Sequence, residues 1–166
     1  MAISNYMAAT AGTVTAAAGT APFFLIQGSA TKVVNVKRII LQGPTLTLVE
    51  YITPVLTKYS SAPSGGTATA LTAVPTDSAN PASTANLLTV YTAAPTPGTA
   101  VGTLGARKLL AQATTAAAAG MVNDTIDFVF TTPITLRGIA EGLGVRLSNA
   151  PVSAVTMSVF VEWTEE

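Results

Sequence analysis

Hydrophobic and polar residues alternate with a period of two over much of this chain. The alternation is clearest in residues 126–130, 143–147 and 157–163. Such a period is typical of a β-strand that buries one of its faces. In the last segment the apolar face consists of Met157, Val159, Val161 and Trp163. We therefore predict three strands here and place Trp163 in the core.

Other segments rich in apolar and β-branched residues predict additional strands. They are residues 23–27, 32–41, 45–52, 87–91, 104–112 and 134–136. Within residues 32–41, alternation places Val34, Val36 and Ile40 on one face, and Arg38 interrupts that face. β-branched and aromatic residues favour pleated, half-buried surfaces, which supports these assignments.

Glycine and proline mark where the predicted strands end. Gly43 and Pro44 predict a turn, and Pro54 indicates an edge, a bulge or a strand break. Residues 60–83 are predicted to form a long loop, of the kind that is usually functional or disordered in a compact domain. Residues 106–119 are open to a second interpretation as a short helix.

The pattern predicts an all-β fold. It gives eight or nine strands separated by glycine and proline turns, without a long amphipathic helix or a repeat of fixed period. Strands at this spacing favour an antiparallel β-sandwich, and we expect the topology of a jelly roll. Residues 22–166 are predicted to form this single domain, which is long enough to bury a core.

Residues 1–21 differ from the rest of the chain because they are mostly small residues with scattered glycines. We expect them to form an N-terminal arm outside the sandwich. Two interpretations are open: a disordered tail, or an extended arm that becomes ordered on a neighbouring subunit. In the second case the partner-binding residues would be Ile3, Tyr6, Met7 and Val14.

The composition limits the chemistry of this protein. Of its 166 residues none is histidine or cysteine, and only 10% are charged. Nucleophilic sites and zinc sites that depend on histidine or cysteine are therefore excluded. The formal net charge of zero provides no basic stripe for nucleic acid and no polybasic patch for a membrane. A weakly charged, neutral surface favours self-association instead.

The remaining candidates for chemistry are carboxylates. Asp124 and Asp127 are close in sequence, but they do not match a calcium-binding loop. Paired carboxylates could also hydrolyse glycosidic bonds, and the candidates are Glu50, Asp77, Asp127, Glu141 and Glu162. Most of these alternate with apolar residues, so we interpret them as solvated positions on strand faces. We expect no enzymatic activity, no metal and no cofactor.

Several short segments, taken in order, resemble a group of small virion proteins of tailed phages. The first is residues 28–39, Gly-Ser-Ala-Thr-Lys-Val-Val-Asn-Val-Lys-Arg-Ile. The others are Gly-Gly-Thr at 65–67, Pro-Thr-Asp-Ser at 75–78, Tyr-Thr-Ala-Ala-Pro-Thr at 91–96, Leu-Arg-Gly at 136–138 and Glu-Trp-Thr-Glu-Glu at 162–166. The resemblance covers residues 28–166 and implies a structural component of a phage particle. It implies no catalytic residue.

We therefore expect a capsid decoration or cement protein on the head of a virion. Its partners would be copies of itself, for instance in a trimer, and the major capsid protein. An alternative within the same class is a tail, neck or fibre-base component. A third is a carbohydrate-binding module for adhesion, in which Tyr51, Tyr59 or Tyr91 would be exposed.

Overall fold

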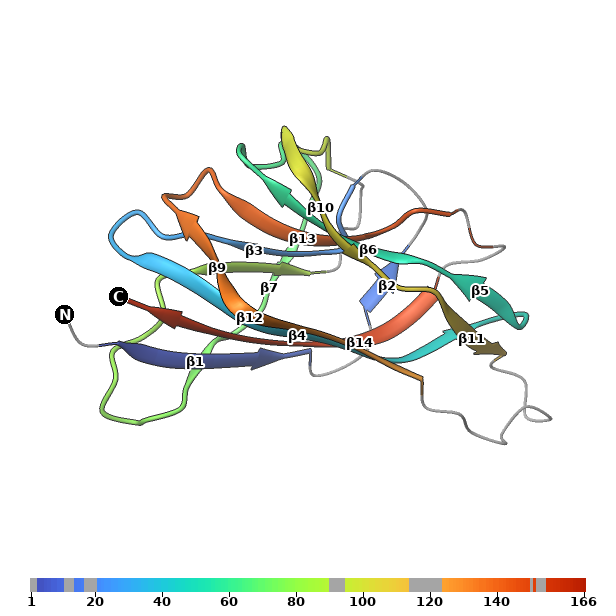
Figure 1. Ribbon diagram of the computed structural model, residues 1–166, viewed down its shortest axis with the longest axis horizontal. Helices are drawn as coiled ribbons and strands as arrows, with labels where there is room; N and C mark the ends of the chain where they lie inside the picture. Colours follow the sequence, from blue (N-terminus) through green and yellow to red (C-terminus); the bar gives the residue numbers. More distant parts are fainter. Residues whose placement is uncertain are drawn as a thin grey trace.

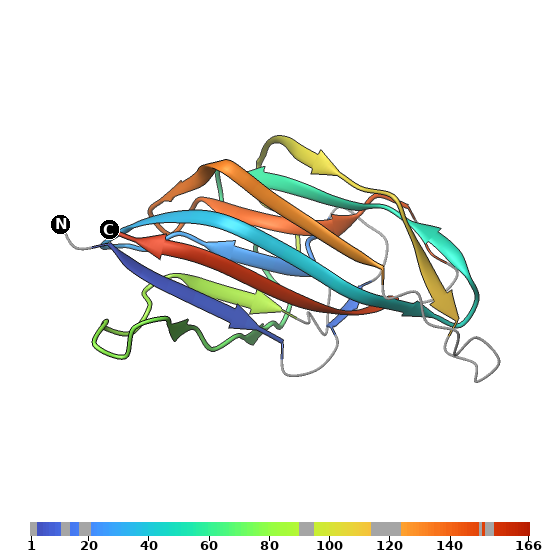
Figure 2. The same ribbon diagram turned by 60° about the horizontal axis from the view of Figure 1, so that its bottom comes forward.

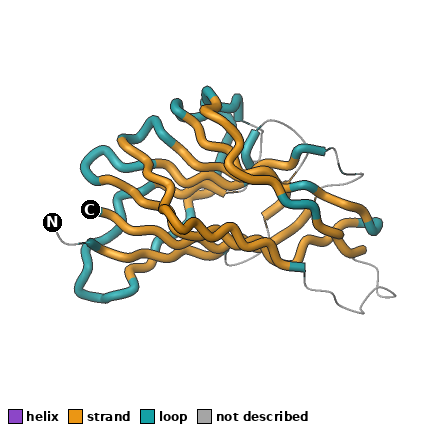
Figure 3. The backbone as a smooth tube through the Cα atoms, in the orientation of Figure 1, coloured by secondary structure: helices purple, strands orange, loops and turns teal. Residues whose placement is uncertain are grey.

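The computed structural model describes residues 3–10, 14–16, 21–89, 95–113, 124–149, 151 and 155–166. These residues form strands, turns and loops, and they contain no helix (Figure 3). Two β-sheets lie on one another in a sandwich-like arrangement (Figures 1 and 2). The prediction of an all-β, antiparallel sandwich is confirmed, whereas the strand order does not confirm a jelly roll.

The larger sheet has eight strands. Its order is β5 (Glu50–Ile52), β11 (Leu109–Ala113), β4 (Val33–Leu46), β14 (Val155–Glu165), β1 (Ser4–Ala9) and β8 (Val74–Pro75). Two further strands join it: β12 (Thr125–Arg137) pairs with β4, and β2 (Val14–Ala16) pairs with β14. All of these pairs are antiparallel except β11 with β4.

The smaller sheet has six strands. Its order is β10 (Ala100–Ala106), β6 (Pro54–Tyr59), β13 (Gly142–Leu147), β3 (Phe24–Gln27), β9 (Asn86–Thr89) and β7 (Thr69–Ala70). Its central strands β6, β13 and β3 are buried on both faces. In the larger sheet β14 alternates between buried and half-buried residues, so one face packs on the core and the other meets solvent. The outer surface of the larger sheet is thus the more open face of the sandwich.

A bulge in β4 explains why the alternation of the sequence wrongly placed Ile40 on the same face as Val34 and Val36. Arg38 lies opposite Glu162 of β14, whereas the next pair is Val36 with Trp163, so Lys37 is an extra residue. The extra residue reverses the alternation. As a result Ile39 is buried and Ile40 is half-exposed, the opposite of our expectation. The interruption at Arg38 was the sign of this bulge.

The predicted turn at Gly43 and Pro44 is also wrong, because β4 continues to Leu46. Both residues lie in a second bulge, between the pair Gln42–Ser158 and the pair Thr45–Thr156. Gly43 has a φ of 60°, a left-handed conformation that glycine adopts without strain. The strand bends here rather than reversing.

The remaining strand predictions hold with changed boundaries. Pro54 does mark a break, because β5 ends at Ile52 and β6 begins at Pro54. Residues 104–112 are divided between β10 and β11. The alternative helix at residues 106–119 is therefore not formed in its described part, residues 106–113, and residues 114–119 lie outside the described part. Residues 126–136 form a single bulged strand, β12.

The N-terminal arm is not confirmed, because part of it is a strand of the domain. Ser4–Ala9 forms β1, which pairs with β14 on one side and β8 on the other. The alternation within this segment buries Tyr6 and Ala8, and it exposes Met7 and Ala9. Small residues therefore did not prevent this segment from entering the sheet.

The backbone at Gly28 predicts a large effect of a single methyl group. A Cβ there would lie 2.4 Å from the carbonyl oxygen of Gly138. Gly28→Ala should therefore lower the free energy of unfolding by about 2 kcal/mol, as overpacking does. Urea denaturation followed by circular dichroism measures this. Gly102→Ala is the control, because its Cβ would meet no atom within 4 Å; equal losses in both variants would contradict the prediction.

Candidate functional site

The outer face of the larger sheet is the first candidate for a functional surface. The strand register aligns Val129 of β12, Arg38 of β4, Glu162 of β14, Met7 of β1 and Val74 of β8 in one row. Val129, Met7 and Val74 are all exposed. The row therefore carries charged residues at its middle and apolar residues toward both ends.

The adjacent row of residues on this face also combines charged and apolar side chains. It contains Asp127, Ile40, Phe160 and Ala9, again from β12, β4, β14 and β1. Ile40 and Phe160 are half-exposed although both side chains are large and apolar. We define the outer face by these two rows together with Lys37. It crosses five strands of one continuous sheet.

The charges on the outer face compensate one another. The guanidinium of Arg38 donates to both carboxylate oxygens of Asp127, including an Nε–Oδ1 bond of 2.9 Å. The ammonium of Lys37 donates to Oδ1 of Asn5 at 2.8 Å. Two basic residues thus face two acidic ones, Asp127 and Glu162, and their formal charges sum to zero. Methionine, aromatic residues and arginine are enriched at surfaces that bind other proteins, and the outer face contains Met7, Phe160 and Arg38.

A buried carboxylate near the end of β14 forms a second notable site. The side chain of Glu165 is 0% exposed. It accepts hydrogen bonds from the backbone amides of Thr84 and Ala85, at 3.0 and 3.1 Å. It also accepts bonds from the hydroxyls of Ser83 and Thr84, at 2.5 and 2.8 Å. These hydrogen bonds, which we call the Glu165 clasp, hold residues 83–85 against the larger sheet. Residues 83–85 come just before β9 of the smaller sheet.

Two further groups complete the environment of Glu165. The indole of Trp163 donates to the carboxylate at 3.2 Å, and the ammonium of Lys32 lies 3.5 Å from it. Burial raises the pKa of Glu165, but the hydrogen bonds from Ser83, Thr84 and Trp163 outweigh burial and lower the pKa to about 2. The group is therefore ionised at neutral pH and is a structural rather than an acid–base residue.

Sequence reasoning missed Glu165, although the sequence contained the signal. The alternation that buries Val161 and Trp163 also buries the residue two positions further on, which is Glu165. An acidic residue on an apolar face needs hydrogen-bond donors. Ser83, the last residue of the predicted loop 60–83, and Thr84, which follows it, supply them.

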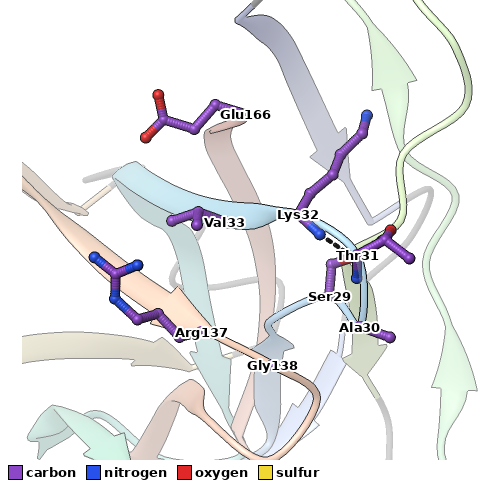
Figure 4. A pocket seen from close by; sticks show the side chains of 8 residues that line it. All are labelled: Ser29, Ala30, Thr31, Lys32, Val33, Arg137, Gly138 and Glu166. Carbon is purple, nitrogen blue, oxygen red and sulfur yellow. Dashed lines mark hydrogen bonds between the residues drawn. The ribbon is translucent and has the colours of Figure 1, made fainter. Parts of the chain in front are cut away.

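A depression of about 530 Å³ lies beside this clasp (Figure 4). It is lined by Ser29, Ala30, Thr31, Lys32, Val33, Arg137, Gly138 and Glu166. The hydroxyl of Ser29 accepts hydrogen bonds from the amides of Thr31 and Lys32, which fixes the loop before β4. Three of the segments singled out in the sequence, residues 28–39, 136–138 and 162–166, therefore meet at one end of the sandwich.

The four predicted partner-binding residues have different surroundings. Ile3 and Met7 are exposed, so they remain available for a partner. Tyr6 is not available: its side chain is 0% exposed and its ring stacks on Trp163 with centroids 5.7 Å apart. Val14 begins β2 and lies opposite Met157, and its side chain is outside the described part.

Two of the five candidate carboxylates, Asp127 and Glu162, lie beside Arg38 on the outer face. Asp127 binds Arg38, Glu141 accepts from the amide of Arg137 at 2.9 Å, and Asp77 accepts from the amide of Ala79 at 2.9 Å. Within the described ranges no three acidic side chains gather where they could hold a metal ion. The described ranges also hold no helix that could span a membrane.

The tyrosines give limited support for a sugar-binding surface. Tyr51 is exposed, and the ammonium of Lys108 lies 4.5 Å from the centre of its ring. Tyr59 is buried, and burial raises the pKa of its hydroxyl. Tyr91 lies outside the described residues. Only one of the three expected tyrosines is therefore shown to be exposed.

Comparisons with known proteins assign no family: no family model, curated protein or solved structure matches this chain.

Proposed function

We propose that this protein is a structural component of a phage virion, and that it stabilises the head as a decoration or cement protein. The observation that carries the proposal is the outer face of the larger sheet, where exposed apolar residues lie around the ion pair of Arg38 with Asp127. A face of this kind suits repeated contacts with a protein lattice, because its exposed apolar side chains gain from burial and Arg38 is already paired with Asp127.

The motif order in the sequence supports the same proposal. Segments at 28–39, 136–138 and 162–166 resemble those of small virion proteins, and they meet at one end of the sandwich. The role needs no reactive side chain, in agreement with a chain that has no histidine and no cysteine. Many copies on a lattice would bind strongly even if each contact were weak, since each bound copy raises the effective concentration of the next contact.

Particle composition tests the proposal first. Particles purified from the phage that carries this gene should contain the protein in copy numbers comparable to the major capsid protein, as measured by quantitative mass spectrometry. A protein absent from purified particles would contradict the proposal. Copy numbers of a few per particle, with immunogold labelling at the tail, would support a tail, neck or fibre-base component instead.

A substitution on the outer face tests the surface. Met7 is exposed and lies opposite Glu162, so Met7→Lys should leave the fold intact. We expect it to weaken rebinding to particles that lack the protein by about tenfold, which corresponds to ~1.4 kcal/mol. Leu48→Lys is the control, because Leu48 is also apolar and exposed but lies in the connection between β4 and β5. Equal binding by both variants would exclude the outer face as the lattice contact.

A further inference from the structure

The outer face of the larger sheet is built symmetrically about a line between two of its strands. The strands β12, β4, β14 and β1 lie side by side in this order, so a line between β4 and β14 leaves two strands on each side (Figure 2). Val129 of β12 is 64% exposed and Met7 of β1 is 38% exposed. The face therefore reaches solvent on both sides of this line.

The row that contains Arg38 is complementary to its own reverse. From β12 to β1 it reads Val129, Arg38, Glu162 and Met7. In the reverse direction Met7 takes the position of Val129, and Glu162 takes the position of Arg38. An apolar residue thus corresponds to an apolar residue, and a cation corresponds to an anion.

The adjacent row has the same property. Ile40 of β4 corresponds to Phe160 of β14, and both are large apolar side chains that are half-exposed. Asp127 of β12 corresponds to Ala9 of β1, and the charge of Asp127 is neutralised within the chain by Arg38. The complementarity therefore extends along the strands over both rows of the outer face.

We propose that two copies of this chain associate through their outer faces, about a two-fold axis that runs parallel to the strands between β4 and β14. Such an axis reverses the order of the strands and keeps each row opposite itself. It places Arg38 opposite the partner's Glu162, and Ile40 opposite the partner's Phe160. Sheets that pack face to face lie about 10 Å apart with their strands nearly aligned, so opposite side chains touch. The outer face is thus complementary to itself, as a two-fold interface requires.

The charged residues determine the direction of the axis. An axis perpendicular to the strands, between the two rows, would place Arg38 opposite the partner's Ile40 and Glu162 opposite the partner's Phe160. Both charges would then be buried against apolar side chains, which is unfavourable. With the axis along the strands, Arg38 can bind two carboxylates: it donates to Asp127 through Nε and Nη2, and Nη1 carries two further donor hydrogens. In the described part of the chain Glu162 forms no salt bridge, so its charge is available to a partner.

This inference deepens the proposed function, because it names a second copy of the chain as the partner of the outer face. Only its use on a particle rests on the proposed function, since purified protein can associate without a particle. The two can therefore fail separately. Absence of the protein from particles would leave the dimer unaffected, and a monomer in solution would leave the particle composition unaffected.

A mixture of two charge variants tests the axis directly. Glu162→Lys would set two positive charges opposite each other across the interface, and Arg38→Glu would set two negative charges opposite each other. Because like charges at an interface are unfavourable, each variant alone should form the dimer more weakly than the natural chain, by about tenfold or more. An equal mixture of the two variants should restore the dimer, since opposite charges then meet at both positions.

Light scattering on the full chain, over a range of concentrations, measures the dimer. Val129→Lys is a further variant that should fold normally, because Val129 is 64% exposed, and it should weaken the dimer by about tenfold because Val129 lies opposite the partner's Met7. Ile139→Lys is the matched control, since Ile139 is 65% exposed in the turn after β12 and lies outside the two rows. Circular dichroism verifies that each variant is folded.

Three results would overturn the proposal. The first is a monomer, or a closed oligomer other than a dimer, at every concentration. The second is a dimer that Val129→Lys and Ile139→Lys weaken equally. The third is a mixture of folded Glu162→Lys and Arg38→Glu chains that associates no better than either variant alone.

Discussion

Glu165→Gln is expected to lower the free energy of unfolding by about 3 kcal/mol at neutral pH. The carboxylate accepts hydrogen bonds from Ser83, Thr84, Ala85 and Trp163 while fully buried. An amide group has only one acceptor oxygen, and its two donor hydrogens would point at other donors. Breaking a buried, hydrogen-bonded charge typically costs about 3–5 kcal/mol.

The pH dependence gives a second and independent expectation. The pKa of Glu165 is lowered from 4.5 to about 2 in the folded chain. A lowered pKa stabilises the fold fully above the unfolded value, and this stabilisation is lost as the pH falls through the folded value. The free energy of unfolding of the natural chain should therefore fall by ~3 kcal/mol between pH 4.5 and pH 2. Glu165→Gln should remove most of this dependence.

Chemical denaturation at a series of pH values measures both effects. Glu166→Gln is the matched control, because the side chain of the adjacent Glu166 is exposed and accepts one hydrogen bond, from Asn35. We expect the control to change the free energy of unfolding by less than about 1 kcal/mol. If the two variants have the same stability and the same acid profile, Glu165 does not hold residues 83–85 in place.

Tyr6→Ala should lower the free energy of unfolding by about 3–4 kcal/mol, as removal of a buried aromatic ring does. Tyr6 stacks on Trp163, and its hydroxyl donates to the carbonyl of Pro81 at 3.0 Å. Met7→Ala is the control on the same strand, since Met7 is 38% exposed and should cost less than about 1 kcal/mol. Urea titration of both variants gives the comparison.

This pair of variants also distinguishes a strand from an arm. If residues 4–9 were an arm that becomes ordered only on a neighbour, neither substitution would change the stability of the isolated chain. A large loss for Tyr6→Ala alone would show that β1 belongs to the folded domain in solution.

Sequence analysis correctly predicted those parts of the fold that depend only on the alternation of hydrophobic and polar residues within one segment. Alternation located β13 and β14 and placed Trp163 in the core, because a period of two determines which residues share a face. It failed at Ile39 and Ile40, where one extra residue in β4 reverses the faces. A bulge depends on the pairing with β14 and β12, which lie about a hundred residues further along the chain.

The candidate site was predicted less completely, for a related reason. Ile3 and Met7 were proposed for partner contacts and are exposed, but Tyr6 between them is buried. Tyr6 is buried because Trp163 lies opposite it in the register of β1 and β14. The rows of the outer face and the clasp at Glu165 likewise arise from pairing between distant strands, which no local pattern contains.

The position of β14 has a consequence for the order in which the chain folds. It is the last of the described strands to be synthesised, yet it lies between β4 and β1 and also pairs with β2. Until it emerges from the ribosome, the nascent chain has no strand to join β1 and β4, and both present unpaired edges. Contacts between residues so far apart in sequence form slowly. The larger sheet is therefore completed only after β14 has been synthesised, and until then the unpaired edges of β1 and β4 are open to aggregation.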